Sequence, residues 1–161
     1  ALTNDIPGES FSVGLSKSTN PIAYIGGTAS RLYYVNDAAT ASSGEEVPIW
    51  DATSIPSNRS FLGGTIGCIE VDPNDEATIY CGFTNIDTDS RIWRLRYANT
   101  DSVQFEDIGG NLPESVPVNW IEVDPDMSDH ILVGTDDGLY TSLNRGESWQ
   151  NEARFPNVPI D

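Results

Sequence analysis

Apolar and polar residues alternate over short segments of this chain, and turn-forming residues separate the segments. Residues 118–123 follow the two-residue period of a half-buried β-strand. Asp124-Pro125-Asp126 then predicts a turn, because proline fixes φ and aspartate caps the turn with its side chain. Residues 131–134 are mostly apolar, as expected for a strand that is buried on both faces. No stretch has a convincing 3.6-residue period, so we predict little helix.

Two more strands complete this unit. Asp136, Asp137 and Gly138 predict a hairpin turn in which glycine supplies the positive φ. A third strand is expected over residues 139–142, and a short fourth strand begins within residues 148–150. The unit therefore consists of four short antiparallel strands joined by tight turns.

The four-stranded unit recurs along the chain. Ile-Glu-Val-Asp-Pro at residues 69–73 returns at residues 121–125, and the apolar run at residues 79–82 returns at residues 131–134 with the same offset. A more divergent copy lies upstream, around residues 23–26. Repeats of about 50 residues are typical of propeller blades. We predict an all-β fold of four-stranded antiparallel β-propeller blades, about three in number, within a larger propeller.

Two other folds explain the pattern less well. Paired helices are disfavoured because proline and glycine interrupt every window that is long enough to hold them. A β-sandwich also has short strands, but it does not predict nearly identical units at a fixed spacing.

The repeat divides residues 1–161 into parts of one partial propeller. We expect a divergent first blade with an N-terminal lead-in at 1–65, a second blade at 66–117, and a third blade with a lead-in to a missing blade at 118–161. Three blades cannot close a ring by themselves. Either the chain is a fragment of a larger propeller or copies join to complete one; a rival is that residues 1–20 add a strand that buries one end.

A motif lies at the end of the third copy. Ser142, Asn144, Gly146 and Trp149 have the spacing Ser-x-Asp-x-Gly-x-x-Trp, with asparagine at the aspartate position. A serine hydroxyl and a short amide can hold backbone N–H groups in a tight turn, and glycine permits a positive φ. The tryptophan is expected to pack between sheets. Asparagine keeps the acceptor oxygen without the charge, so we expect a slightly weaker turn.

These four residues resemble the Asp-box, and the chain is similar to bacterial Asp-box (BNR) repeat β-propellers over about residues 66–161. The similarity is loose over residues 1–65. Such blades occur in sortilin-like receptors, xyloglucanases, sialidases and photosystem II assembly factors, and residues 111–123 resemble secreted members described as glycosyl hydrolase-like or sortilin-like. The resemblance implies a propeller whose Asp-box is structural and distant from the ligand face. It implies no particular activity.

The chain is strongly acidic, with 25 Asp and Glu against 8 Lys and Arg and a formal net charge of -17. This charge repels nucleic acid and anionic lipid, so we expect neither as a partner. It suits cations, basic partners or simple solubility. No apolar run approaches the roughly 20 residues of a membrane span, and no signal peptide is visible, which a processed N-terminus would explain. We expect a secreted or cell-surface protein.

One loop has the residue types of a calcium site. Asn85, Asp87 and Asp89 alternate oxygen ligands as at the start of a calcium loop, although the glycine and the distant glutamate of an EF-hand are missing. An ordinary polar hairpin loop is the alternative. No other cofactor is indicated.

Cys68 and Cys81 fall on two strands that are expected to pair as a hairpin. If they face each other across the ladder, a Cα separation near ~5.5 Å would permit a disulfide, which an extracellular setting would favour. Two buried free thiols are the alternative.

No set of residues indicates catalysis within the chain. His130 is the only histidine, and it has no second histidine or nearby cysteine with which to bind a metal. Asp72 and Asp124 occupy equivalent repeat positions beside proline, which indicates turn structure. Glu70 and Glu122 are equivalent as well, whereas a catalytic acid is normally unique to one blade. We therefore assign no catalytic residue.

Three functional hypotheses remain. The first is a non-catalytic module that binds protein or glycan through loops at one end of the propeller, with residues 37–48 and 85–90 as the contacts. The second is part of a glycoside hydrolase, xyloglucanase- or sialidase-like, whose cleft is completed outside this chain. The third is a structural or assembly subunit. Its partners would be the remaining blades of the same protein or further copies of this chain.

Overall fold

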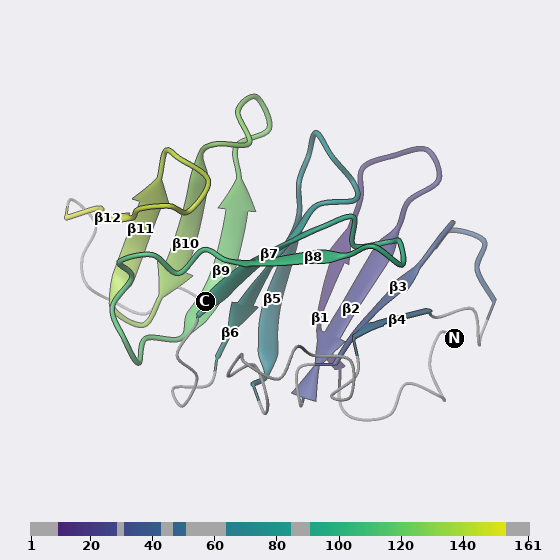
Figure 1. Cartoon of the computed structure of the whole chain (residues 1–161), viewed down its shortest axis with the longest axis horizontal. Coiled ribbons are helices and arrows are strands. Elements are labelled where there is room, and N and C mark those ends of the chain that lie inside the picture. The colour runs from purple at the N-terminus through teal and green to yellow at the C-terminus, as the bar shows by residue number, and fades with distance from the viewer. Residues whose placement is uncertain (1–9, 29–30, 43–46, 51–63, 85–90, 154–161) are drawn as a thin grey trace.

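A computed structural model describes residues 10–28, 31–42, 47–50, 64–84 and 91–153. Within these residues every regular element is a β-strand, and twelve strands form three antiparallel sheets of four. The sheets stand side by side in chain order, as the colours of Figure 1 show. The predicted all-β fold of four-stranded antiparallel blades is confirmed. None of the described segments forms a helix long and apolar enough to cross a membrane.

Each sheet is a meander in which neighbouring strands follow one another in sequence. The first sheet contains β1 (Ser10–Leu15), β2 (Ala23–Gly27), β3 (Leu32–Val35) and β4 (Val47–Trp50). The second contains β5 (Ile66–Val71), β6 (Ile79–Phe83), β7 (Ile92–Arg96) and β8 (Gln104–Asp107). The third contains β9 (Val118–Val123), β10 (Ile131–Thr135), β11 (Gly138–Ser142) and β12 (Gln150–Asn151).

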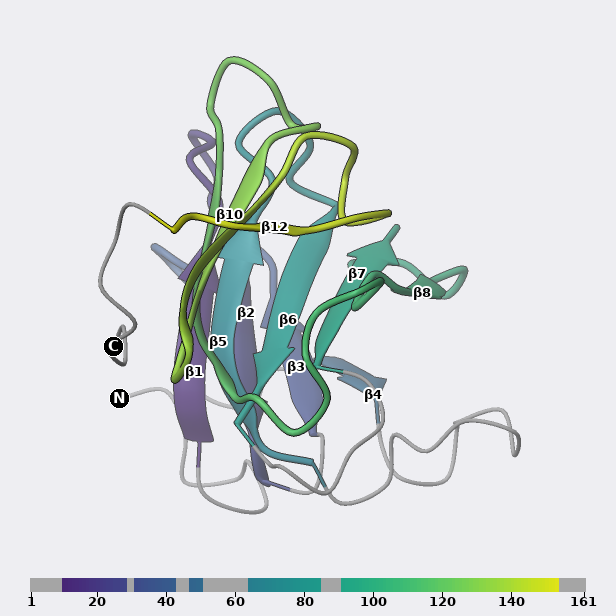
Figure 2. The same cartoon turned by 90° about the vertical axis from the view of Figure 1, so that its left-hand side faces the viewer.

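The first strand of each sheet lies next to the first strand of the following sheet, since β1 contacts β5 and β5 contacts β9. β1 is therefore one of the four regular strands of the first sheet. One expectation had placed residues 1–20 in an additional strand that buries one end of the propeller. The sheets twist outward from these inner strands, and in Figure 2 the outermost strand β12 crosses the direction of β10. The predicted lead-ins at the two ends include residues 1–9 and 154–161, which lie outside the described residues.

The core consists of the apolar layers between the sheets. One cluster joins the first and second sheets and another joins the second and third, while a small third cluster lies on the outer side of the first sheet. At each junction the inner strand of the later sheet directs its apolar residues back onto the earlier sheet. These residues are Ile66, Ile69 and Val71 of β5 and Val118, Ile121 and Val123 of β9.

Glycine in the second strand of each sheet allows this close approach. A Cβ atom at Gly26 would lie 2.8 Å from Cγ2 of Ile66, and a Cβ atom at Gly82 would lie 2.7 Å from Cγ1 of Val118. Real Cβ atoms essentially never come so close to a neighbour, so any larger residue would push the sheets apart. Gly134 occupies the same register position in the third sheet, because it pairs with the first apolar residue of the following strand, as Gly82 does.

We expect Gly82→Ala to lower the free energy of unfolding by about 1–3 kcal/mol, since the added methyl group overpacks the junction between the second and third sheets. Urea denaturation followed by tryptophan fluorescence measures the change. An unaltered midpoint would show that the two sheets are not packed as closely as described.

Candidate functional site

The turn between β11 and β12 is held by the side chains of Ser142 and Asn144. The Ser142 Oγ accepts hydrogen bonds from the N–H groups of Gly146, at 2.8 Å, and of Asn144, at 3.3 Å, and it donates to Asn144 Oδ1 at 2.9 Å. Asn144 Oδ1 also accepts from the N–H of Ser148 at 3.0 Å. Gly146 has φ 88°, the left-handed conformation for which glycine was expected here.

Trp149 joins this turn to the preceding sheet. Its side chain is buried, and its indole Nε1 donates to the carbonyl oxygen of Ile108 at 2.8 Å. The Trp149 N–H donates to Asn111 Oδ1 at 2.7 Å, while Asn111 Nδ2 donates back to the Trp149 carbonyl oxygen at 3.0 Å. The polar groups of this turn are thus bound within the protein and tie the third sheet to the connection that leaves the second.

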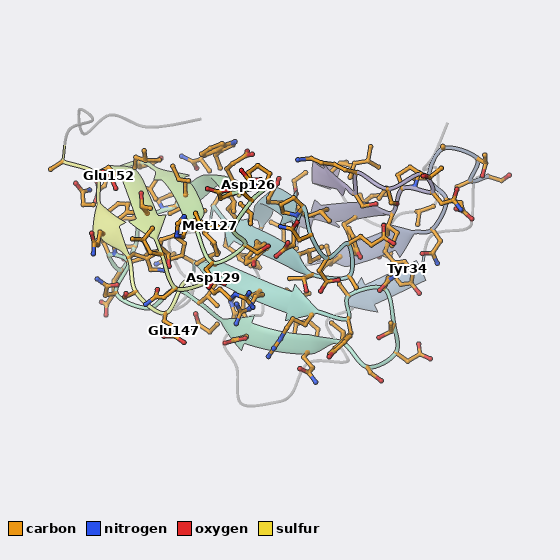
Figure 3. All side chains as sticks on the ribbon, turned by 90° about the horizontal axis from the view of Figure 1, so that it is seen from above. Tyr34, Asp126, Met127, Asp129, Glu147 and Glu152 are labelled. Atoms are coloured by element: carbon orange, nitrogen blue, oxygen red, sulfur yellow. The ribbon has the colours of Figure 1, made fainter. Side chains whose placement is uncertain are left out.

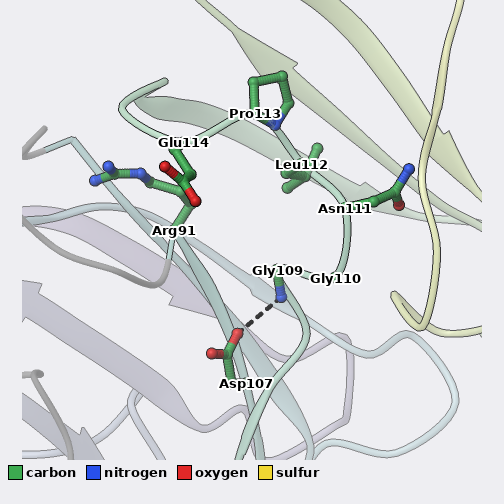
Figure 4. A pocket seen from close by; sticks show the side chains of 8 residues that line it. All are labelled: Arg91, Asp107, Gly109, Gly110, Asn111, Leu112, Pro113 and Glu114. Atoms are coloured by element: carbon green, nitrogen blue, oxygen red, sulfur yellow. Dashed lines mark hydrogen bonds between the residues drawn. The ribbon is translucent and has the colours of Figure 1, made fainter.

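A hollow of about 290 Å³, here named the Arg91 cavity, lies beside the connection from β8 to β9. Figure 4 shows the carboxylates of Asp107 and Glu114 on two sides of this hollow, with the Arg91 side chain near Glu114. The lining residues are Arg91, Asp107, Gly109, Gly110, Asn111, Leu112, Pro113 and Glu114.

Local turn chemistry shapes the Arg91 cavity. The Asp107 Oδ1 accepts the N–H of Gly109 at 2.9 Å, and Gly110 has φ 51°, so the chain turns sharply after β8. Arg91 is buried and directly follows residues 85–90, the loop that was expected to contact a ligand. The sequence pattern alone did not predict this cavity. The sequence signal for a sharp turn here was Asp107 before Gly109 and Gly110, with Pro113 after them.

A second hollow, of about 210 Å³, lies at the opposite end of the second sheet and contains Asp72, Tyr80 and Arg94. Its polar groups are largely occupied by one another. Asp72 accepts from the Ser128 hydroxyl at 2.7 Å and from the Tyr80 hydroxyl at 3.3 Å, while Arg94 donates to Glu106 at 2.7 Å. Burial and the adjacent Asp72 charge raise the pKa of Tyr80 to about 12. This arrangement fixes the loops of neighbouring sheets to each other.

Glu70 lies on the inner strand β5, and Glu122 has the equivalent position on β9. Burial raises the pKa of Glu70 to about 7, and the nearby Glu122 charge adds to the shift. The positive charge of Lys17 offsets part of this rise in the pKa of Glu70. The repeat equivalence of the two glutamates was predicted, whereas the altered acidity depends on packing between the strands.

The two cysteines do not form the disulfide that was one of the two expectations. Cys68 pairs with Gly82 across the ladder and Cys81 pairs with Ile69, so the two side chains point to opposite faces of the sheet. Both thiols are free. Burial raises the pKa of the Cys68 thiol to about 12 and also raises the pKa of the Cys81 thiol.

The expected calcium ligands Asn85, Asp87 and Asp89 lie outside the described residues. Among the residues that the structure describes, no group of three or more His, Cys, Asp or Glu side chains is placed to hold a metal ion. His130 lies in the turn before β10, with its Nδ1 3.8 Å from Asp124 Oδ2.

No protein-family model and no curated protein matches this chain. Among solved structures, its fold is similar to the crystal structure of the GH74 xyloglucanase from Xanthomonas campestris, a β-propeller, with a TM-score of 0.56 and 16% sequence identity. The match covers 84% of this chain and 20% of that chain, so this chain spans about a fifth of the length of that enzyme.

The three sheets are propeller blades. In this arrangement β1, β5 and β9 are the inner strands of consecutive blades, and the Arg91 cavity lies where the second blade connects to the third. At this level of sequence identity the similarity concerns the fold alone.

We expect Ser142→Ala to lower the free energy of unfolding by about 1–3 kcal/mol, because the buried N–H of Gly146 loses its acceptor. Ser148→Ala is the matched control, since the hydroxyl of Ser148 is exposed and accepts, among the described residues, only from Asn144 Nδ2, at 2.9 Å, so its loss leaves no buried group without a partner. Thermal unfolding of both variants gives the comparison. Equal effects of the two substitutions would contradict the assigned hydrogen-bond network.

We expect Glu70→Gln to stabilise the protein at high pH only. The folded-state pKa lies above the ordinary value, so ionisation of Glu70 opposes folding, and the cost appears as the pH rises from about 4.5 to about 7. After allowance for solvent screening, the variant should gain about 1–2 kcal/mol at high pH and nothing in acid. Urea denaturation across this pH range measures the difference, with the exposed-loop variant Glu147→Gln as control. A gain that is independent of pH would contradict the assignment.

Proposed function

We propose that this chain is a non-catalytic part of a secreted or cell-surface β-propeller of the Asp-box type, and that it binds glycan at the Arg91 cavity. The observation that carries the proposal is the composition of this cavity. Charged groups from Arg91, Asp107 and Glu114 meet the apolar Leu112 and Pro113 around one hollow of about 290 Å³.

This composition suits a neutral sugar better than an anionic ligand or a flat protein surface. Carboxylates and guanidinium groups form paired hydrogen bonds with neighbouring hydroxyls, and apolar side chains pack against the C–H face of a sugar ring. A net charge of -17 disfavours anionic ligands such as nucleic acid. A concave site of this size also suits a small ligand better than a flat protein surface.

Two further observations support the family and the location. The hydrogen bonds of Ser142, Asn144 and Gly146, together with the buried Trp149, are those that an Asp-box needs to hold its turn. The turn supports one wall of the Arg91 cavity, since Asn111, which lines the cavity, is hydrogen-bonded to Trp149. Secretion agrees with the acidic composition and with the resemblance to secreted repeat proteins.

A glycoside hydrolase whose cleft is completed by other blades is the second candidate. It is favoured by the fold similarity to a xyloglucanase and by the raised pKa of Glu70 near Glu122, because hydrolysis requires a protonated acid and a second carboxylate. Incubation of the protein with xyloglucan and other β-glucans, followed by a reducing-sugar assay, separates hydrolysis from binding.

We expect Glu114→Gln to weaken the binding of xyloglucan oligosaccharides about tenfold, because a hydrogen bond to a charged acceptor is replaced by a neutral one. Isothermal titration calorimetry measures the dissociation constant, and Glu147→Gln on the turn before β12 is the matched control. If xyloglucan does not bind, a glycan array supplies the test ligand. Unchanged affinity in Glu114→Gln, or no binding to any glycan, would refute the proposal.

A further inference from the structure

One wall of the Arg91 cavity is a single short stretch of chain, here named the cavity wall, which runs over residues 109–114. All lining residues except Arg91 and Asp107 belong to this stretch. It lies between β8 and β9 and outside both strands, so no ladder of backbone hydrogen bonds fixes its position. The shape of the cavity therefore depends on what the wall contacts on its other side.

The Asn111 side chain joins the cavity wall to the turn between β11 and β12. Its Oδ1 accepts from the Trp149 N–H at 2.7 Å, and its Nδ2 donates to the Trp149 carbonyl oxygen at 3.0 Å. Figure 4 shows this side chain pointing away from Arg91 and Glu114. Because both of its polar atoms are bonded to Trp149, Asn111 shapes the cavity through its place in the wall and not by offering its amide to a ligand.

Two glycines bring the cavity wall into close contact with the same turn. A Cβ atom at Gly110 would lie 3.0 Å from the Glu147 carbonyl oxygen and 3.1 Å from that of Gly146. In return, a Cβ atom at Gly146 would lie 2.7 Å from Cβ of Ile108, the residue that precedes the wall. Segments packed this closely cannot shift independently, so a displacement of the turn is passed on to the wall.

The indole of Trp149 adds a bond that blade packing alone does not require. Phe105 lies two residues before the end of β8, as Trp149 lies two residues before the end of β12. A phenyl ring has no N–H group, whereas Trp149 donates from Nε1 to the carbonyl oxygen of Ile108 at 2.8 Å. The second blade packs against the first without such a donor, so this bond belongs to the turn that adjoins the Arg91 cavity.

The turn is itself fixed within the third blade. The Arg145 N–H donates to the Asp129 carbonyl oxygen at 2.9 Å, and the side chains of the same two residues form an ion pair. Figure 3 shows Glu147 of this turn beside Asp129 of the loop before β10. Since the Ser142 hydroxyl also holds the Gly146 N–H, the turn offers the cavity wall a rigid support.

We propose that Asn111 is a positioning residue of the Arg91 cavity, through which the turn at residues 142–149 holds the cavity wall in its ligand-binding shape. The inference rests on the glycan-binding proposal and deepens it, because it names what keeps that site preorganised. A wall that is already ordered spares the ligand the entropy of ordering it. Coupling of this kind is reciprocal, so a bound ligand also stabilises the turn. This role goes beyond the structural one that the resemblance to Asp-box proteins implies.

Asn111→Ala should raise the dissociation constant of xyloglucan oligosaccharides about tenfold, because the ligand must then order a loosened wall. Asn111→Asp keeps the acceptor for the Trp149 N–H and should weaken binding less. Isothermal titration calorimetry measures the affinities, circular dichroism verifies folding, and a glycan array supplies the ligand if xyloglucan does not bind.

Asn74→Ala is the matched control. Asn74 Nδ2 donates to the Pro125 carbonyl oxygen at 3.1 Å and to the Ser128 hydroxyl at 3.0 Å, so it also joins the second and third blades, but at the second hollow. This variant should keep the original dissociation constant. Equal affinities of Asn111→Ala and Asn74→Ala would overturn the positioning role alone. No binding of any glycan by the unaltered chain would refute the glycan-binding proposal and this inference together.

A spectroscopic measurement separates coupling from a general loss of stability. The chain has four tryptophans, so ¹⁹F NMR of protein labelled with 5-fluorotryptophan can follow Trp149, whose resonance Trp149→Phe identifies. Saturating ligand should move this resonance in the unaltered chain and in Asn74→Ala, and should move it less in Asn111→Ala. A Trp149 resonance that the bound ligand leaves in place, or that moves equally in Asn111→Ala, would overturn the coupling.

Discussion

The contact between the inner strand of one blade and the glycine-bearing face of the preceding blade organises this structure. Ile69 and Ile121 project onto sheets whose second strands carry Gly26 and Gly82, and the lack of a Cβ atom lets the sheets meet closely. A four-stranded sheet cannot bury both faces alone, so its stability depends on its neighbours. Each blade thus needs the next, which explains why the same apolar residues recur at the same register.

Polar contacts between loops align the neighbouring blades that the apolar residues hold together. Loops at one end join neighbouring blades through a hydroxyl and a carboxylate, with the two roles exchanged between Ser16–Glu76 and Asp72–Ser128. The Trp149 turn joins the outer part of the third blade to the connection from the second. Because inner and outer strands are both tied across the junctions, the cavity beside Gly110 is built on a rigid support.

The strand pattern could be predicted from sequence because it depends on neighbouring residues. The alternation over β9, the apolar run of β10 and the turn at Gly138 require only local geometry, and the structure has these strands within about a residue or two of their expected bounds. The hydrogen bonds within the Ser142 turn are also local, since its groups lie within a few residues of one another.

Other features depended on register and on distant segments. A bulge in β5 shifts the pairing so that Cys68 faces the third blade and Cys81 faces the first, and a shift of one residue is enough to reverse the face of a side chain. The Arg91 cavity likewise brings the start of β7 to a connection some twenty residues later. Neither result can be read from a linear pattern.

The sequence by itself determined the repeated four-stranded unit, its turns and the acidic charge, because these follow from short-range periodicity and composition. Only the tertiary structure decided which faces are buried, which carboxylate has a raised pKa and which apolar residues remain uncovered. Burial is a property of the stacked sheets, and identical positions differ in it: Ile121 is covered by a neighbouring blade, whereas Val13, at the same register, faces solvent.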